Sequence, residues 1–275
     1  MKIAVTGAGG FLGRGIVDEL IAHNVSVVAV GNHIDSVNKS AYKISGDIFK
    51  MDDPFFEMGK PDVVLHLAWQ DGFVHSSDAH LKNLNKHTIF LKKLLNSPLN
   101  KLSVMGTVHE IGFFEGSVNE NTPANPQSEY GIAKNALRQY IKLYADKNKK
   151  KYQWLRAFYI VKADIIGNSI FSKLMRAESN GENKFPFTTG RNQNDFLEYD
   201  IFSRMVAETV IQDSVLGIIN ISSGYPQSLS DVVEKFIKKN KLNIKLDYGA
   251  YPDREYDSKA IWGNSSKIDK IMNKS

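Results

Sequence analysis

A glycine-rich turn behind a short apolar strand is the feature that most constrains this chain. The run Ile3-Ala4-Val5 leads into Thr6-Gly7-Ala8-Gly9-Gly10-Phe11-Leu12-Gly13, and apolar residues then recur with helical spacing. This order predicts a strand, a tight turn and a helix. Glycine lets the backbone approach a ligand closely, and the free N–H groups at a helix start attract anions. We therefore expect Gly7, Gly10 and Gly13 to cradle the pyrophosphate of a dinucleotide. The alternative is an ordinary glycine-rich turn.

Strand and helix patterns alternate along the first part of the chain. The predicted strands are rich in β-branched and apolar residues and cover residues 2–5, 25–30, 42–44, 63–67, 102–105 and 152–158. Such alternation predicts an α/β fold with a doubly wound parallel sheet. Turn-rich segments break the rhythm later. We expect a dinucleotide-binding domain over residues 1–165 and a small, interleaved substrate-binding lobe over 166–275, with 217–223 returning a strand to the main sheet.

A second informative segment, Tyr130-Gly131-Ile132-Ala133-Lys134, lies far downstream. Residues four apart lie on one face of a helix, so Tyr130 and Lys134 can share a site. A tyrosine with its ordinary pKa of about 10 is a poor acid or base near neutrality, and a nearby cation lowers that pKa. We expect a proton-transfer pair here. The alternative is two surface residues on an amphipathic helix.

Composition limits the other kinds of site. The chain has no cysteine, which excludes disulfides, thiol nucleophiles and thiolate metal ligands and fits a reducing cytoplasm. Its seven histidines show no metal-binding spacing, so we expect no metal site. The net charge of +5 suits anionic ligands, but the basic run 147–151 lacks interleaved aromatics, so nucleic-acid binding is not expected. We also expect no signal peptide and no membrane span, and a cytoplasmic location.

Together, the glycine-rich turn and the Tyr130–Lys134 pair resemble the extended branch of the short-chain dehydrogenase/reductase superfamily, which contains nucleotide-sugar epimerases, dehydratases and 4-keto-reductases. Further segments match that branch in order, at residues 46–48, 61–68, 85–88, 155–159, 194–200 and 217–224. The resemblance implies a Rossmann fold, an NAD(P) cofactor and a nucleotide-sugar substrate. It also implies a homodimer packed through the helix that carries Tyr130. Apolar residues of that helix offer a surface for a partner or for its own sheet, namely Leu137, Tyr140, Ile141 and Tyr144.

The resemblance also implies roles for individual residues. Thr107 takes the place of the family's catalytic hydroxyl when Ile111-Gly112 is aligned with the family's Tyr-Gly, and Ser103 is a weaker candidate. Tyr130 would exchange the proton, while Lys134 would bind the nicotinamide ribose and lower the Tyr130 pKa. Further cofactor contacts are expected from residues near strand ends, namely Phe11, Leu12, Asn32, Asp47, Ile48, Leu67 and Ala68.

Substrate contacts are expected from Asn168, Arg191 and Arg254, since arginines suit a diphosphate. His109 is a further candidate, although a loop histidine can equally be a plain hydrogen-bonding residue. The same two roles are open to Glu110. Aromatic stacking by Phe185 and Phe187 is possible for a nucleotide base, but we assign both rings to the core.

The segment Val30-Gly31-Asn32-His33 bears on the choice of dinucleotide. NAD is favoured by an acidic residue at the end of the second strand, which binds both ribose hydroxyls. This chain has no carboxylate there until Asp35, and Asn32 with His33 leaves room and donors for a 2′-phosphate. We therefore expect NADP to be preferred over NAD.

Three functions compete. Val108 and His109 stand where the dehydratases of the family carry an Asp and a Glu, which argues against a dehydratase. We expect reduction of the C4 ketone of a nucleotide-activated 4-keto-6-deoxy sugar, as in enzymes that form 6-deoxytalose, abequose or paratose. The alternatives are a nucleotide-sugar 4-epimerase with bound NAD and a non-catalytic dinucleotide-sensing protein. The missing acid after the second strand counts against the epimerase, because that acid would favour NAD. The Tyr130–Lys134 pair counts against the dinucleotide-sensing protein.

Overall fold

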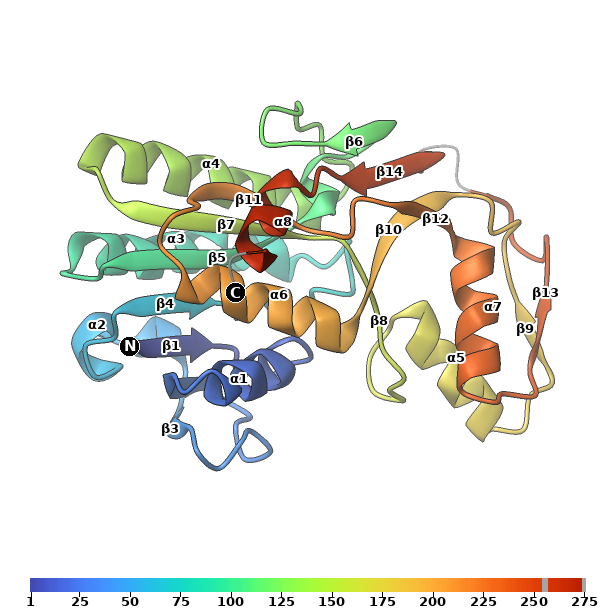
Figure 1. Cartoon of the computed structure of the whole chain (residues 1–275), viewed down its shortest axis with the longest axis horizontal. Coiled ribbons are helices and arrows are strands. Elements are labelled where there is room, and N and C mark those ends of the chain that lie inside the picture. The colour runs from blue at the N-terminus through green and yellow to red at the C-terminus, as the bar shows by residue number, and fades with distance from the viewer. Residues whose placement is uncertain (254–256, 274–275) are drawn as a thin grey trace.

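Seven parallel strands form the main sheet of the computed structural model, which describes residues 1–253 and 257–273 (Figure 1). The chain winds outward from β1 to β3 and then returns to place β4 on the other side of β1. Ligands of open α/β sheets bind at the carboxyl ends of the strands, where the winding reverses. In spatial order the strands are β11 (Gly217–Ile221), β7 (Lys151–Ala157), β5 (Lys101–Thr107), β4 (Val63–His66), β1 (Lys2–Thr6), β2 (Ser26–Gly31) and β3 (Tyr42–Ser45).

This arrangement confirms the doubly wound α/β fold. The six strands expected in the first part of the chain are all present, and each begins within one residue of its predicted start. Their apolar runs are continuous because helices bury both faces of the sheet. Ile3 and Val5 of β1, for example, point into one apolar cluster, while Ala4 between them points into the other.

Two layers of helices cover the sheet (Figure 1). On one face lie α1 (Gly13–Ala22), α6 (Tyr199–Ile211) and α8 (Ser266–Met272). The other face carries α3 (Ala79–Asn96) and α4 (Glu129–Asn148), with the short α2 (Pro54–Glu57) nearby. Leu137 and Ile141 of α4 are fully buried in this second layer. The apolar side of α4 that we considered for a partner therefore packs largely on its own sheet.

A smaller lobe lies beside the carboxyl ends of the strands, at the right of Figure 1. It is built on a second sheet and has its own apolar core, in which Phe187 is buried and Phe185 is packed, as expected. Its elements are β6 (Gly116–Val118), β8 (Tyr159–Val161), α5 (Ile170–Ser179), β9 (Lys184–Pro186), β10 (Gln193–Glu198), β12 (Pro226–Ser228), α7 (Leu229–Lys239), β13 (Lys245–Asp247) and β14 (Ala260–Gly263).

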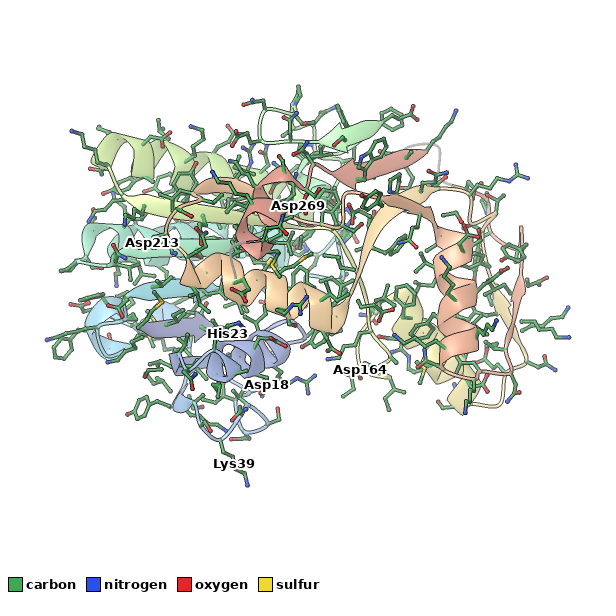
Figure 2. All side chains as sticks on the ribbon, in the orientation of Figure 1. Asp18, His23, Lys39, Asp164, Asp213 and Asp269 are labelled. Carbon is green, nitrogen blue, oxygen red and sulfur yellow. The ribbon has the colours of Figure 1, made fainter. Side chains whose placement is uncertain are left out.

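Buried polar links hold these parts together. Asp195 of β10 accepts hydrogen bonds from the N–H groups of Ser223, Gly224 and Gly263, so one carboxylate ties three chain segments of the lobe. At the opposite end of the main sheet, Asp213 pairs with Lys101 of β5 at 2.8 Å (Figure 2).

No helix in residues 1–253 and 257–273 is long and apolar enough to cross a membrane.

Candidate active site

A cleft of about 1390 Å³ lies at the carboxyl ends of the main strands and extends into the lobe. Its walls come from the glycine-rich turn, the ends of β2, β4 and β5, the start of α4, and the lobe around α5 and β10. A pocket for one drug-sized ligand measures about 300–1,000 Å³, so this cleft has room for two ligands side by side.

The glycine-rich turn lines the cleft and is packed against the ends of two strands. Gly7 has φ +72°, and a Cβ there would lie 2.7 Å from the backbone N of Ala68. A Cβ on Gly9 would lie 1.5 Å from the carbonyl oxygen of His33. Glycine is thus required for the turn to sit this close to β2 and β4. Gly9 was absent from our predicted set, although its role is the most restrictive.

All the predicted cofactor contacts line this cleft. Besides the glycines, they are Phe11, Leu12, Asn32, Asp47, Ile48, Leu67 and Ala68. The Asp47 carboxylate accepts a hydrogen bond from the N–H of Phe49 at 3.0 Å, and thereby caps the short 3-10 helix η1 (Ile48–Lys50). Leu12 and Gly13, at the start of α1, line the cleft, and the N–H groups at a helix start attract anions such as a diphosphate.

Thr107, Tyr130 and Lys134 line the same cleft. The Ser128 hydroxyl caps α4 by accepting from Gly131 N–H at 3.2 Å, which sets Tyr130 and Lys134 on its first turns. Thr107, the last residue of β5, is hydrogen-bonded to the Tyr130 side chain. Lys134 Nζ donates to the Met105 carbonyl at 2.9 Å and lies 6.0 Å from the centroid of the Tyr130 ring.

Ser103, the weaker hydroxyl candidate, is buried on β5 and donates to the Gln153 side chain at 2.8 Å. It does not line the cleft. Thr107 is therefore the hydroxyl on β5 that reaches Tyr130.

Burial dominates the electrostatics of the pair. It raises the pKa of Tyr130 to about 12, although the hydrogen bond from Thr107 acts in the opposite direction. Burial also lowers the pKa of Lys134 to about 7, against the attraction of Glu110. The expected lowering of the Tyr130 pKa was wrong for this structure, because desolvation of the phenolate outweighs any stabilisation by the nearby cation.

An aromatic and histidine-rich wall surrounds Tyr130, and our sequence analysis missed it apart from His109. The His75 ring stacks on Tyr130 with centroids 5.1 Å apart, and the His75 carbonyl accepts from Tyr130 N–H at 3.1 Å. The His80 ring lies 5.1 Å from Tyr130, and Trp69 lies 6.3 Å away. The sequence could have indicated this wall, because residues 69–80 directly follow β4, whose carboxyl end lies at the cleft.

His109 and Glu110, whose roles the sequence left undecided, lie on the short 3-10 helix η2 (Val108–Glu110) but face different surroundings. His109 lines the cleft with its ring centroid 4.2 Å from that of His75, so it can contact a ligand. Glu110 is fully buried away from the cleft, where it accepts hydrogen bonds from Trp154 at 2.9 Å and Arg156 at 2.8 Å. Glu110 therefore anchors η2 to β7, and Thr107 with it.

The predicted substrate residues are not all brought together. Asn168 lines the lobe side of the cleft. Arg191 is exposed and is not among the lining residues, and Arg254 lies outside the described residues. The lobe instead contributes mainly uncharged side chains, including Tyr159, Thr188, Asn192, Asn194 and Phe196.

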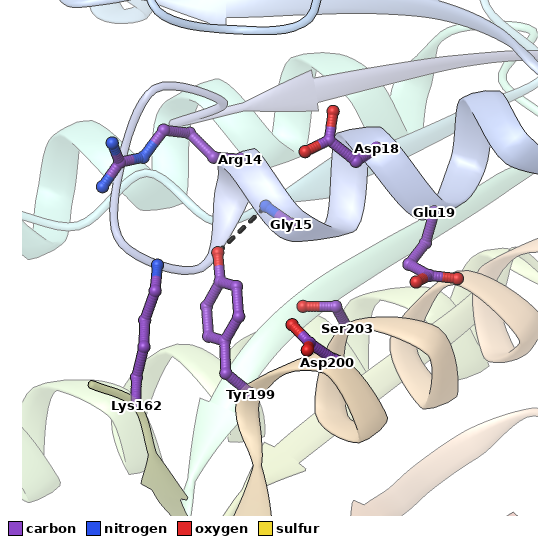
Figure 3. Close-up of a pocket in the computed structure, with 8 residues that line it drawn as sticks. All are labelled: Arg14, Gly15, Asp18, Glu19, Lys162, Tyr199, Asp200 and Ser203. Carbon is purple, nitrogen blue, oxygen red and sulfur yellow. Dashed lines mark hydrogen bonds between the residues drawn. The ribbon is translucent and has the colours of Figure 1, made fainter. Parts of the chain in front are cut away.

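A second, smaller pocket of about 270 Å³ lies between α1 and α6, behind the glycine-rich turn (Figure 3). The Tyr199 hydroxyl accepts from Gly15 N–H at 2.9 Å and donates to the Phe11 carbonyl at 2.7 Å. Lys162 Nζ lies 3.7 Å from the centroid of the Tyr199 ring. This tyrosine thus ties the turn to α6.

Comparison with known proteins identifies the family of this chain. Residues 3–208 match the model of the NAD dependent epimerase/dehydratase family. The chain belongs to that family. A relative in Aggregatibacter actinomycetemcomitans, named dTDP-6-deoxy-L-talose 4-dehydrogenase (NAD(+)), is 40% identical over 96% of this chain and 99% of its own length. A putative UDP-glucose 4-epimerase of Methanocaldococcus jannaschii is 26% identical over 88% of this chain and 83% of its own length.

Solved structures of several nucleotide-sugar epimerases share the fold. A UDP-N-acetylglucosamine 4-epimerase from Methanobrevibacter ruminantium superposes with a TM-score of 0.84 at 21% identity, covering 98% of this chain and 91% of the other. A UDP-glucuronic acid 4-epimerase from Bacillus cereus, in complex with UDP-glucuronic acid and NAD, gives 0.81 at 22% identity over 100% and 94%. The expected membership of this enzyme family is confirmed.

Proposed function

We propose that this protein is an NAD(P)-dependent oxidoreductase that acts at C4 of a nucleotide-activated 6-deoxy sugar, reducing the C4 ketone to an alcohol. The observation that carries the proposal is the meeting of Thr107, Tyr130 and Lys134 in one cleft with the glycine-rich turn. The relative that is 40% identical supports the sugar class, because its name describes oxidation at C4 of a dTDP-6-deoxy-talose, the reverse of such a reduction.

The dinucleotide, when bound, supplies or accepts the hydride; the chain supplies orientation and the proton. Thr107 holds the sugar oxygen beside the Tyr130 hydroxyl. Burial raises the pKa of Tyr130 to about 12, so the phenol stays protonated near neutrality and is a weak acid. It gives its proton to the more strongly basic alkoxide oxygen that forms at C4 as the hydride adds. Lys134 holds the nicotinamide ribose, and His109 and Asn168 contact the substrate from the two sides of the cleft.

For the dinucleotide, we propose that Asn32 at the end of β2 makes NADP the preferred form. Asn32 is exposed at the cleft and brings no carboxylate to repel a 2′-phosphate. One observation favours NAD instead, namely the NAD(+) in the name of the relative. Separate titrations with NADPH and NADH decide between them.

The test of the function is an assay of the purified protein with NADPH, and separately NADH, on dTDP-, GDP- and CDP-linked 4-keto-6-deoxy sugars. We expect stoichiometric loss of reduced-nicotinamide absorbance with one nucleotide series. A parallel reaction supplies ordinary nucleotide hexoses with catalytic NAD. C4 inversion there without net oxidation would make the protein a 4-epimerase, and dinucleotide binding without turnover in either assay would make it a sensor.

A further inference from the structure

Trp69 lines the cleft, and the proposed reaction does not use it. It follows Ala68 at the carboxyl end of β4 and lines the cleft between the glycine-rich turn and Tyr130. A large indole in this position takes up space beside the proposed nicotinamide site. Its contacts show what holds it there and what it holds in turn.

The indole is fixed by two histidines of α3. Its Nε1 donates to His80 Nδ1 at 3.0 Å, and since an indole can only donate, His80 carries its proton on Nε2. That nitrogen is 2.8 Å from the Val74 carbonyl, to which it donates. The His87 ring stacks on the indole with centroids 4.4 Å apart and planes inclined by 18°. Trp69 is therefore oriented by a hydrogen bond and a stacking contact.

The same indole receives the Lys134 ammonium. Lys134 Nζ lies 3.9 Å from the centroid of the ring, well within the distance of a cation–π interaction. Lys134 is buried, and its ammonium donates a hydrogen bond to the Met105 carbonyl. A desolvated ammonium with few acceptors gains most from an aromatic face, because no water competes for it.

We propose that Trp69 is a positioning residue that holds the Lys134 ammonium on its indole face and so keeps it charged and oriented beside Tyr130. Lys134 then presents its remaining N–H groups to the cleft. The consequence for the reaction rests on the proposed function, in which Lys134 meets the nicotinamide ribose. The contact itself does not rest on that function.

Other groups around Lys134 act on its charge as well. Glu110 of η2 attracts the ammonium, while His66 of β4 and His87 of α3 face it as imidazoles that burial keeps neutral, and Tyr130 shares its helix. Glu110 is committed to Trp154 and Arg156. A substitution of Trp69 therefore changes the surroundings of Lys134 and keeps the hydrogen bonds of Glu110 with Trp154 and Arg156.

The test follows the ionisation of Lys134 directly, without dinucleotide or sugar. Protein labelled with ¹³C-lysine is titrated from about pH 5 to about pH 10, and the Lys134 Cε resonance is assigned by its loss in Lys134→Met. We expect Trp69→Leu to move the Lys134 midpoint about one pH unit lower, since a buried cation–π contact stabilises only the charged form. Trp69→Phe, which keeps an aromatic face, should shift the midpoint less.

Trp262→Leu is the matched control, because that tryptophan lies on β14 and does not line the cleft. It should leave the Lys134 midpoint in place. An unchanged midpoint in Trp69→Leu would overturn the proposal. If Trp69→Leu does not fold, Trp69→Met, which also removes the aromatic face, is measured by the same criterion. A shift without turnover on any sugar would refute the proposed function and leave the Trp69 contact standing.

Discussion

At the scale of single residues, the site depends on how strongly each polar group is desolvated. Tyr130 and Lys134 lie close together, yet burial moves their pKa values in directions that favour the neutral form of each. A protonated phenol suits proton donation, and this is the direction of reaction that we propose.

The role of Tyr130 is tested by Tyr130→Phe. The substitution removes the hydroxyl that touches Thr107 and keeps the ring that stacks on His75, so dinucleotide binding should be retained. Turnover should fall by about 10²–10⁴-fold, as for loss of a general acid. Undiminished turnover in the absorbance assay would reject the role of Tyr130.

A second residue-scale prediction concerns Asn32. Asn32→Asp places a carboxylate at the exposed end of β2, where it repels a 2′-phosphate and can bind a free ribose hydroxyl. We expect NADPH affinity to fall at least about tenfold more than NADH affinity, equivalent to about 1.4 kcal/mol. Fluorescence titrations with both dinucleotides measure this ratio, and equal losses would show that Asn32 does not discriminate.

At the scale of elements, the glycine-rich turn is held from behind by α6. Tyr199 is the first residue of α6, and its hydroxyl bridges the Phe11 carbonyl and the Gly15 N–H of the turn and α1. A Cβ on Gly15 would lie 2.6 Å from the Tyr199 ring, so α1 and α6 come this close only because Gly15 lacks a side chain. The position of the glycine-rich turn therefore depends on α6, whose first residue lies 188 residues after Phe11 in the chain.

Tyr199→Phe tests this connection. It leaves the Gly15 N–H and the Phe11 carbonyl without their partner, which costs about 1–3 kcal/mol in the free energy of unfolding. We expect a lower melting temperature and weaker dinucleotide binding, both measured on the same preparation. Tyr225→Phe, on an exposed tyrosine, is the control. Loss of stability with unchanged dinucleotide affinity would show that the link supports the fold and not the cradle.

At the scale of the whole molecule, buried histidines connect pH to stability. His66 and His87 lie between the sheet and α3, joined by a 3.0 Å contact between ring nitrogens. Burial lowers the pKa of His87 to about 3, so it stays neutral in the folded protein while the unfolded chain takes up a proton below about pH 6.5. The unfolded state then binds more protons, and stability falls as pH drops.

For His87 alone, the free energy of unfolding should fall by about 2 kcal/mol between pH 6.5 and pH 5. Urea unfolding at several pH values measures this slope. His87→Gln should flatten it, whereas His33→Gln, at an exposed position, should not. An equal slope in both variants would contradict the assignment.

The homodimer stays a prediction at this scale. Leu137 and Ile141, on the helix expected to carry it, are used by the protein's own core. Exposed apolar residues on the outer sides of α3 and α4 are the surface that remains for a partner, namely Leu81, Ile89, Ile132 and Leu143. A monomeric mass in solution scattering would exclude the dimer.

The parts of the site that could be predicted are those defined by short-range pattern. The glycine-rich turn follows its strand directly, and Tyr130 and Lys134 are one helical turn apart, so local spacing suffices to pair them. Trp69, His75 and His80 escaped prediction because each lies in or just after an irregular segment without a periodic pattern. Contacts such as that of Tyr130 N–H with the His75 carbonyl join residues far apart in the sequence. Arg191 was placed by analogy in a lobe whose loops position it outside the cleft.

The sequence by itself determined the alternation of elements, the cradle and the proton-transfer pair, because these are encoded in residues close together in the chain. Tertiary structure decided the ionisation of Tyr130 and Lys134, the anchoring of Glu110 to Arg156 and the link from Tyr199 to the turn. Each of these depends on groups far apart in the sequence. Desolvation and hydrogen bonding between them arise only when the sheet brings their strands and helices together.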